Sequence, residues 1–199
     1  MKNSNALIII AKYPEAGAVK TRLNGSMRDD DILRLYTHLL EQTILNLRQI
    51  PGVDTYIAYM PGTAKIYFSR FLTGLVPLSP DDLGANMSHS FEVIFGKGHR
   101  KAVLVGADIP GLSASIVLNA FDLLSDNDLV FGPAEDGGYY LVGMSKLIRE
   151  VFENVTWSSE QTLRESLEQA GKSGYTAGYT KKLRDIDTIE DVKKAGFAV

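Results

Sequence analysis

Stretches typical of buried β-strands alternate with stretches typical of helices along almost the whole chain. Residues 6–11 and 102–106 are short apolar runs. Residues 29–50, in contrast, begin with three aspartates and continue with apolar side chains at helical spacing. This alternating order favours parallel strands that are joined by crossover helices. The sequence therefore predicts an α/β fold with a mostly parallel central sheet and helices on both of its faces.

The same patterns assign the remaining elements. Strands are expected at residues 6–11, 53–60, 75–78, 102–106, 129–132, 139–143 and 175–180. Helices are expected at residues 29–50, 63–72, 83–95, 113–124, 146–152 and 159–170, and from Thr188 onward. No internal repeat, low-complexity tract or linker separates these elements, so we expect residues 1–199 to form a single domain.

Composition argues against several classes of function. With a net charge of −3, the chain lacks the clustered positive charge of a general nucleic-acid surface. The absence of cysteine excludes disulfides, thiolate metal sites and a cysteine nucleophile. The three histidines lack ligand spacing, and we expect them to be structural or surface residues and Trp157 to belong to the core. No apolar stretch is long enough for a membrane span or a secretory signal, so a soluble cytoplasmic protein is expected.

Ligand crevices in open parallel sheets lie beyond the carboxyl ends of the strands, which makes the segments there candidates for the site. The first such segment is residues 11–23, where Gly17 permits a tight turn. Lys12, Lys20 and Arg22 of this segment can converge on phosphate oxygens. It is not a P-loop, because the two positions before Lys20 that must be glycine hold other residues. The alternative is that Lys12 and Lys20 are solvated surface side chains.

Two aspartates are candidate metal ligands. Asp108 ends an apolar strand, where an unpaired buried carboxylate would be costly, and Asp187 precedes the last helix. A hard cation such as Mg²⁺ or Mn²⁺ takes one or two carboxylates and completes its shell with substrate phosphates and water. The alternatives are that Asp108 belongs to a turn or a helix N-terminus, and that Asp187 caps the last helix.

The segment EDGG lies between two predicted strands. Gly137 and Gly138 would let a substrate lie close to the backbone, and Glu135 or Asp136 would hold sugar hydroxyls or act as the base. Tyr139 is a candidate for the same sugar or acceptor side, because one of the two consecutive tyrosines can face the crevice. The alternative is a plain hairpin turn, for which Asp-Gly is a common signal.

Taken together, these motifs resemble a bacterial family of small glycosyltransferase-A-like proteins, most of which are known only as predicted nucleotide-diphospho-sugar transferases. The matching segments, between residue 7 and about residue 195, are KYPEAGAVKTRL, DDLGANM, GADIPGLS, GPAEDGGYYLVGM, FENVTWSS and DIDTIEDV. One branch of the family is associated with arsenosugar biosynthesis. The molybdenum-cofactor and 2-phospholactate guanylyltransferases of the same superfamily look similar in the first loop and in the Asp-x-Pro turn.

The resemblance implies a Rossmann-like glycosyltransferase-A fold that binds a nucleotide diphosphate or triphosphate with a divalent metal. By position, Lys20 and Arg22 would contact phosphates and Asp108 would contact the metal. Asp136 and the two glycines after it would contact the sugar or the acceptor.

Three functions are compatible with these features. The leading hypothesis is metal-dependent transfer of a glycosyl group from a nucleotide-diphospho-sugar donor to a small-molecule acceptor, with Mg²⁺ or Mn²⁺ as cofactor. The second hypothesis is nucleotidyl transfer, which would release pyrophosphate from a nucleoside triphosphate. The third is a nucleotide-binding module without turnover.

Overall fold

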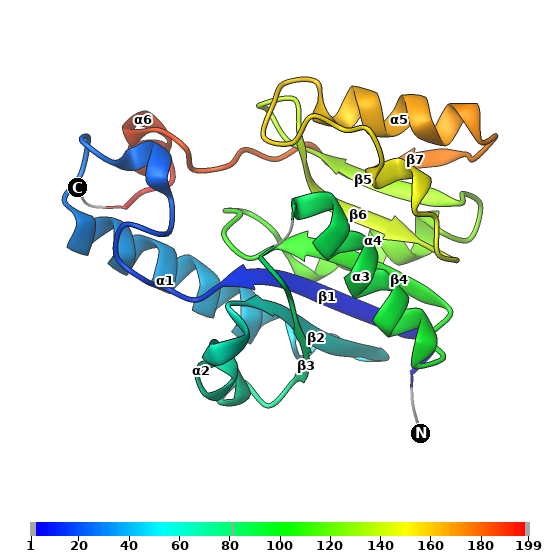
Figure 1. The fold of residues 1–199 in the computed structure, drawn as a ribbon, viewed down its shortest axis with the longest axis horizontal. Helices are drawn as coiled ribbons and strands as arrows, with labels where there is room; N and C mark the ends of the chain where they lie inside the picture. Colours follow the sequence, from blue (N-terminus) through cyan, green and yellow to red (C-terminus); the bar gives the residue numbers. More distant parts are fainter. Residues whose placement is uncertain (1–2, 81, 198–199) are drawn as a thin grey trace.

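The computed structural model describes residues 3–80 and 82–197, which form a seven-stranded sheet with helices on both sides (Figure 1). The strand order across the sheet is β3-β2-β1-β4-β6-β5-β7. The strands are β1 (Asn5–Lys12), β2 (Val53–Met60), β3 (Gly74–Pro77), β4 (Lys101–Gly106), β5 (Leu129–Pro133), β6 (Tyr139–Met144) and β7 (Ala177–Tyr179). The helices are α1 (Asp29–Leu47), α2 (Lys65–Ser69), α3 (Leu83–Gly96), α4 (Ala114–Leu123), α5 (Thr162–Lys172) and α6 (Ile189–Lys194).

All strand pairings are parallel except those of β6, which runs antiparallel to β4 and β5. The exception follows from the short connection at residues 134–138, because parallel neighbours need a crossover of a dozen or more residues. The predicted α/β class, with a Rossmann-like and mostly parallel sheet, is therefore confirmed.

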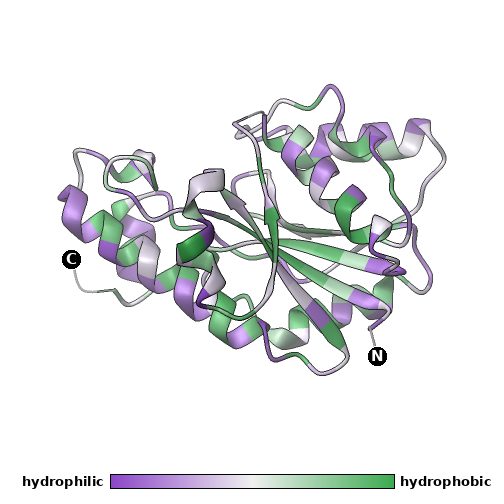
Figure 2. Ribbon diagram, turned by 60° about the horizontal axis from the view of Figure 1, so that its bottom comes forward, coloured by the Kyte–Doolittle hydropathy of each residue, from purple (hydrophilic) through white to green (hydrophobic). Residues whose placement is uncertain are grey.

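Side chains along each central strand point alternately to the two faces of the sheet, and an apolar core lies on each face. In β1, Leu7 and Ile9 face a core that includes side chains of α1, α2 and α4. Ala6 and Ile8 face the opposite core, with side chains of α3 and α5. Figure 2 shows the apolar colouring along the central strands. Helices thus cover both faces of the sheet. A ligand can enter where the loops lie, at the carboxyl ends of the parallel strands.

The C-terminal segment crosses from β7 to the far end of α1 (Figure 1). Ile186 and Val192 of this segment pack against Leu23 and Leu35 in a third, smaller core. The segment ends in α6, where the Thr188 hydroxyl accepts a hydrogen bond from the Asp191 backbone N–H in a capping box. The cap of this helix is therefore Thr188 and not Asp187.

Two predicted helices differ from the structure. The helix expected near residues 146–152 is a single 3₁₀ turn, η3 (Glu150–Phe152), preceded by non-helical chain. Ile148, Val151 and Phe152 have helical spacing because all three are buried in one core, which imitates an amphipathic helix. The helix expected from residue 159 begins at Thr162, after a turn. Within residues 3–80 and 82–197, no helix combines the length and the apolarity that crossing a membrane requires.

The fold predicts a large stability difference between two apolar positions. Phe131→Ala empties a site that is 0% exposed in the centre of β5, and it should lower the free energy of unfolding by about 3–5 kcal/mol. Ile66→Ala, at a position on α2 that is 87% exposed, should change it by less than about 0.5 kcal/mol. Urea unfolding measures both, and comparable losses in the two variants would contradict the assigned core.

Candidate active site

Four loops meet at one edge of the sheet. Strands β1 and β4 are adjacent and parallel, with Ile10 opposite Gly106, so the loops that follow them leave the sheet side by side. The connection at residues 134–138 reaches the same edge because it joins the end of β5 to the start of the antiparallel β6. Ala134 also bridges to Leu183, which brings the segment after β7 to this edge.

Lys20 and Asp108 form an ion pair between the first two of these loops. The Lys20 Nζ lies 2.7 Å from Asp108 Oδ2, and the lysine side chain is only 8% exposed. Burial is the largest influence and would lower the pKa of Lys20, but the carboxylates of Asp108, Asp185 and Asp187 together outweigh it and the net pKa is raised. Lys20 has a left-handed backbone (φ 46°), an uncommon conformation for a non-glycine residue. Lys20 is therefore a buried, charged group and not a solvated surface lysine.

The rest of the first loop is held less tightly. The backbone N–H of Lys12 donates to the Tyr36 hydroxyl, and this hydroxyl donates in turn to the Lys12 carbonyl, which fixes the end of β1. The Lys12 side chain is exposed. Gly17 has a left-handed backbone (φ 76°), as its predicted turn requires, but open space surrounds it.

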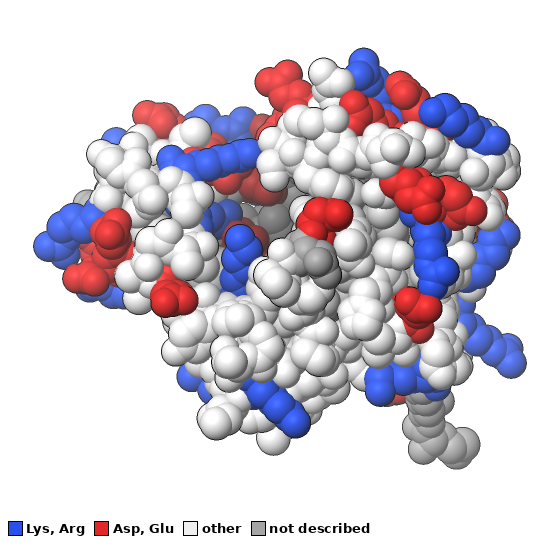
Figure 3. Space-filling model, in the orientation of Figure 1, with Lys and Arg blue, Asp and Glu red and all other residues white. Residues whose placement is uncertain are grey.

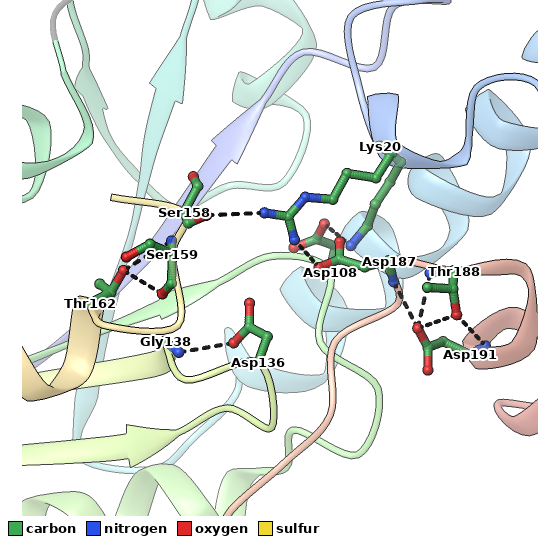
Figure 4. Close-up of polar contacts among 11 residues, drawn as sticks. Lys20, Asp108, Asp136, Gly138, Ser158, Ser159, Thr162, Asp187, Thr188 and Asp191 are labelled. Carbon is green, nitrogen blue, oxygen red and sulfur yellow. Dashed lines mark hydrogen bonds and ion pairs between the residues drawn. The ribbon is translucent and has the colours of Figure 1, made fainter. Parts of the chain in front are cut away.

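Arg22 joins the first loop to the C-terminal segment. Its guanidinium forms an ion pair with Asp187 and also donates to the Ser158 carbonyl at 3.4 Å. Figure 4 shows Asp187, Ser158 and the Lys20–Asp108 pair around one opening, and Figure 3 shows the hollow with basic and acidic side chains along its rim. The predicted convergence of cations and carboxylates from separate loops is thus observed.

Three carboxylates gather beside these cations. Asp136, Asp185 and Asp187 can each place one oxygen so that all three oxygens lie within 4.8 Å of one another. Burial, followed by the charge of Asp108, raises the pKa of Asp185 to about 7. Among the described residues, no group hydrogen-bonds the buried Asp185 Oδ1. Both predicted metal ligands pair with a cation, Asp108 with Lys20 and Asp187 with Arg22, but only Asp187 belongs to this acid cluster.

The acid cluster suits a divalent cation. Its donors are all carboxylate oxygens, which Mg²⁺ and Mn²⁺ prefer. A cation would also satisfy the unpartnered oxygen of Asp185 and relieve the mutual repulsion of the three acids. Sequence reasoning missed Asp185 because the segment RDIDT is explained by a turn followed by a helix cap.

Two adjoining pockets open at this edge. The lysine pocket, of about 290 Å³, is lined by Lys12, Lys20 and Tyr36 among others. The aromatic pocket, of about 200 Å³, is lined by Tyr139, Trp157, Ser158, Asp136 and Asp185 among others. Ile10, Leu83, Gly106 and Asp108 line both pockets. The two pockets therefore form one cleft, and Asp108 lies where they meet.

In the EDGG segment, two residues have structural contacts and two line the cleft. Glu135 forms an ion pair with Arg184 and lines neither pocket. Gly137 has a left-handed backbone (φ 89°), and an added Cβ would lie 2.3 Å from the Glu160 carbonyl oxygen. The absence of a side chain at Gly137 therefore allows the two loops to pack closely, because the loop before α5 occupies that space. The Gly138 N–H donates to Asp136 Oδ1 at 3.0 Å, which holds that carboxylate at the cleft.

Tyr139 and Trp157 line the aromatic pocket and also pack against the core. Their ring centroids are 6.3 Å apart in an edge-to-face arrangement. The Tyr139 hydroxyl is buried, and burial raises its pKa, so this side chain offers its ring and not a charged oxygen. Trp157, which was predicted to be structural, is partly buried and contributes to the pocket wall as well.

The fold is that of an α/β protein of the nucleotide-diphospho-sugar transferase-like class. The chain belongs to the DUF2064 family of uncharacterised proteins conserved in bacteria, which it matches over residues 31–159. A solved structure from Desulfovibrio desulfuricans G20, described as a proposed nucleotide-diphospho-sugar transferase, is 30% identical. The alignment covers 96% of this chain and 85% of that chain, with a TM-score of 0.89. Among curated proteins, none matches this chain.

More distant solved structures share the fold alone. The inositol-1-phosphate CTP transferase from T. maritima is 14% identical, with a TM-score of 0.56 and 100% of each chain covered. Rv0371c from Mycobacterium tuberculosis H37Rv, solved as a complex with manganese, is 15% identical. Its TM-score is 0.56, and 98% of each chain is covered.

The raised pKa of Asp185 predicts a specific pH dependence of stability. Between about pH 4 and pH 7 the folded chain keeps a proton on Asp185 that the unfolded chain has lost, so this group stabilises the fold at low pH. The contribution disappears as the pH rises through 7. From pH 8 to pH 5 without metal, the free energy of unfolding of the wild type should rise relative to that of Asp185→Asn, by about 1 kcal/mol or more.

Urea unfolding at several pH values measures this difference. Asp122→Asn, at an exposed position on α4, should keep the wild-type pH dependence. Parallel curves for the wild type and Asp185→Asn would contradict the assignment.

Proposed function

We propose that this protein transfers a glycosyl group from a nucleotide-diphospho-sugar donor to a small acceptor, with a divalent metal. One observation carries the proposal: the cations Lys20 and Arg22 meet carboxylates from three other segments at a single rim. A nucleoside diphosphate needs cations for its phosphate oxygens, and carboxylates are needed there if a metal ion helps to bind it. The relative with 30% identity supports the same class of reaction.

The cation would be held by Asp185 and Asp187, the partly buried members of the acid cluster. When bound, Mg²⁺ or Mn²⁺ supplies positive charge that stabilises the diphosphate as it leaves. Rv0371c, a more distant protein of the same fold, was solved as a complex with manganese, which supports the choice of metal in this proposal.

Lys20 and Arg22 would bind the phosphate oxygens. Both side chains are already placed by carboxylates, Lys20 by Asp108 and Arg22 by Asp187, so little side-chain entropy is lost when the phosphates bind. In this proposal Asp108 is a positioning residue for Lys20. Lys12, which lines the lysine pocket with an exposed side chain, would add a weaker contact to the nucleotide.

Asp136 would orient or deprotonate the acceptor hydroxyl. It is the exposed member of the acid cluster, and it lines the aromatic pocket. Its Oδ1 accepts the Gly138 N–H, which leaves Oδ2 to accept a hydrogen bond from a hydroxyl. Glu135 has no role at the reacting atoms here, since its partner is Arg184.

Product analysis tests the proposal. With Mn²⁺ and a panel of UDP-, GDP-, CDP- and dTDP-sugars, we expect release of a nucleoside diphosphate for at least one donor. Lys20→Met should lower this rate by about 100-fold or more, because it removes the buried cation beside the leaving phosphate. Lys172→Met, at an exposed position at the end of α5, should leave the rate unchanged.

Two outcomes would contradict the proposal. Release of pyrophosphate from nucleoside triphosphates, without diphosphate release from any sugar donor, would indicate a nucleotidyltransferase. A Lys20→Met variant as active as the wild type would remove the proposed phosphate site. Because both residues in this substitution are non-glycine, the left-handed backbone at position 20 costs about the same in each protein.

A further inference from the structure

The two halves of the cleft differ in charge. The lysine pocket contains Lys12 and Lys20. The aromatic pocket is lined by three carboxylates, those of Asp108, Asp136 and Asp185, and within residues 3–80 and 82–197 no lysine, arginine or histidine lines it. The nearby cations are already neutralised, because Lys20 is paired with Asp108 and Arg22 with Asp187.

The aromatic pocket offers an acceptor to a ligand hydroxyl. The carboxylate of Asp136 can only accept when ionised. The hydroxyls of Ser159 and Thr162 can both donate to the Thr156 carbonyl, so their hydrogens are used within the loop. The Gly138 N–H is used by Asp136. A ligand with hydroxyl groups can therefore donate to Asp136 and can also accept from the indole N–H of Trp157.

The apolar part of the pocket fits the face of a ring. Trp157 and Tyr139 form adjoining walls, and Leu83 and Met87 complete the apolar lining. A sugar ring has hydroxyl donors around its edge and C–H groups on its faces, and aromatic side chains provide large rigid surfaces against which such faces pack. Both properties match the pocket.

A bound cation does not reverse the charge of this region. With Arg22 balanced by Asp187, the acid cluster keeps the charges of Asp136 and Asp185, which the two positive charges of Mg²⁺ or Mn²⁺ offset, and a nucleoside diphosphate then adds negative charge beside them. A phosphate or carboxylate group in the aromatic pocket would be repelled by this charge, and as an acceptor it could not hydrogen-bond to the ionised Asp136 carboxylate.

We infer that the aromatic pocket takes an uncharged polyhydroxyl ring and discriminates against a sugar that carries a phosphate or a carboxylate. This inference rests on the proposed function, because it names the class of group that occupies the second half of the same cleft. It limits the transferred sugar or its acceptor to neutral molecules. A transferase that binds a sugar phosphate would need a cation in this pocket, and within the described residues no lysine, arginine or histidine lines it.

Calorimetric titration with matched sugars tests this inference. Glucose, galactose and mannose are each compared with their uronic acid and their 6-phosphate, in the presence of Mn²⁺ and the nucleoside diphosphate that binds best. At least one neutral sugar should bind about tenfold or more tightly than both of its anionic forms. The discrimination should shrink as ionic strength rises, because salt screens the repulsion.

A charge variant tests whether the pocket itself is responsible. Leu83, on the first turn of α3, lines the pocket and is 41% exposed, so Leu83→Lys places a cation at its wall with little cost in packing. This variant should reduce the discrimination against the 6-phosphate by about tenfold. Leu118→Lys, at a position on α4 that is 42% exposed and lines neither pocket, is the matched control and should bind as the wild type does.

The remaining outcomes overturn the inference. A uronic acid or sugar phosphate that binds as tightly as the neutral sugar contradicts it, and so does the absence of binding by every sugar while the nucleoside diphosphate binds. If the nucleoside diphosphate itself does not bind, the proposed function fails. In that case the same sugar panel without nucleotide still measures the preference of the pocket, so the two failures are distinguishable.

Discussion

The ion pair between Lys20 and Asp108 is the contact on which the site depends. It joins the loop after β1 to the loop after β4, the two central strands whose carboxyl ends lie side by side. A buried lysine or a buried aspartate alone would be costly, whereas the pair is tolerated at the bottom of a cleft. The pair therefore keeps a positive charge next to the place where Asp185 and Asp187 arrive from the C-terminal segment.

The remaining architecture distributes charge across the cleft. The C-terminal segment crosses the edge of the sheet and is anchored on α1 by Ile186 and Val192. Asp185 and Asp187 lie on this segment. The apolar packing of Ile186 and Val192 therefore positions the two residues that are proposed to bind the metal. Lys12 and Lys20 line one pocket, and Tyr139, Trp157 and two of the acids line the other. In the proposed function, the first pocket would hold the donor phosphates and the second would hold a neutral sugar.

Local patterns predicted the fold well and the site in part. The strand at Lys101–Gly106 is found where the apolar run at residues 102–106 predicts it, because the apolar side chains of a buried strand are themselves the signal. Lys20 and Asp108 could be expected near each other from the rule for parallel sheets. Asp185 could not, because its burial depends on where a long crossing segment packs. The packing of Gly137 against Glu160 likewise depends on a contact between distant loops.

The most direct test of the account is the coupling between metal and nucleotide binding, measured by calorimetric titration of a nucleoside diphosphate with and without Mn²⁺. Cations and acids that share one rim should make the diphosphate bind about tenfold or more tightly when Mn²⁺ is present. Asp187→Asn should abolish most of this gain, whereas Asp122→Asn should retain it. Equal affinity with and without Mn²⁺ in the wild type would contradict the claim that these charges form a single metal and diphosphate site.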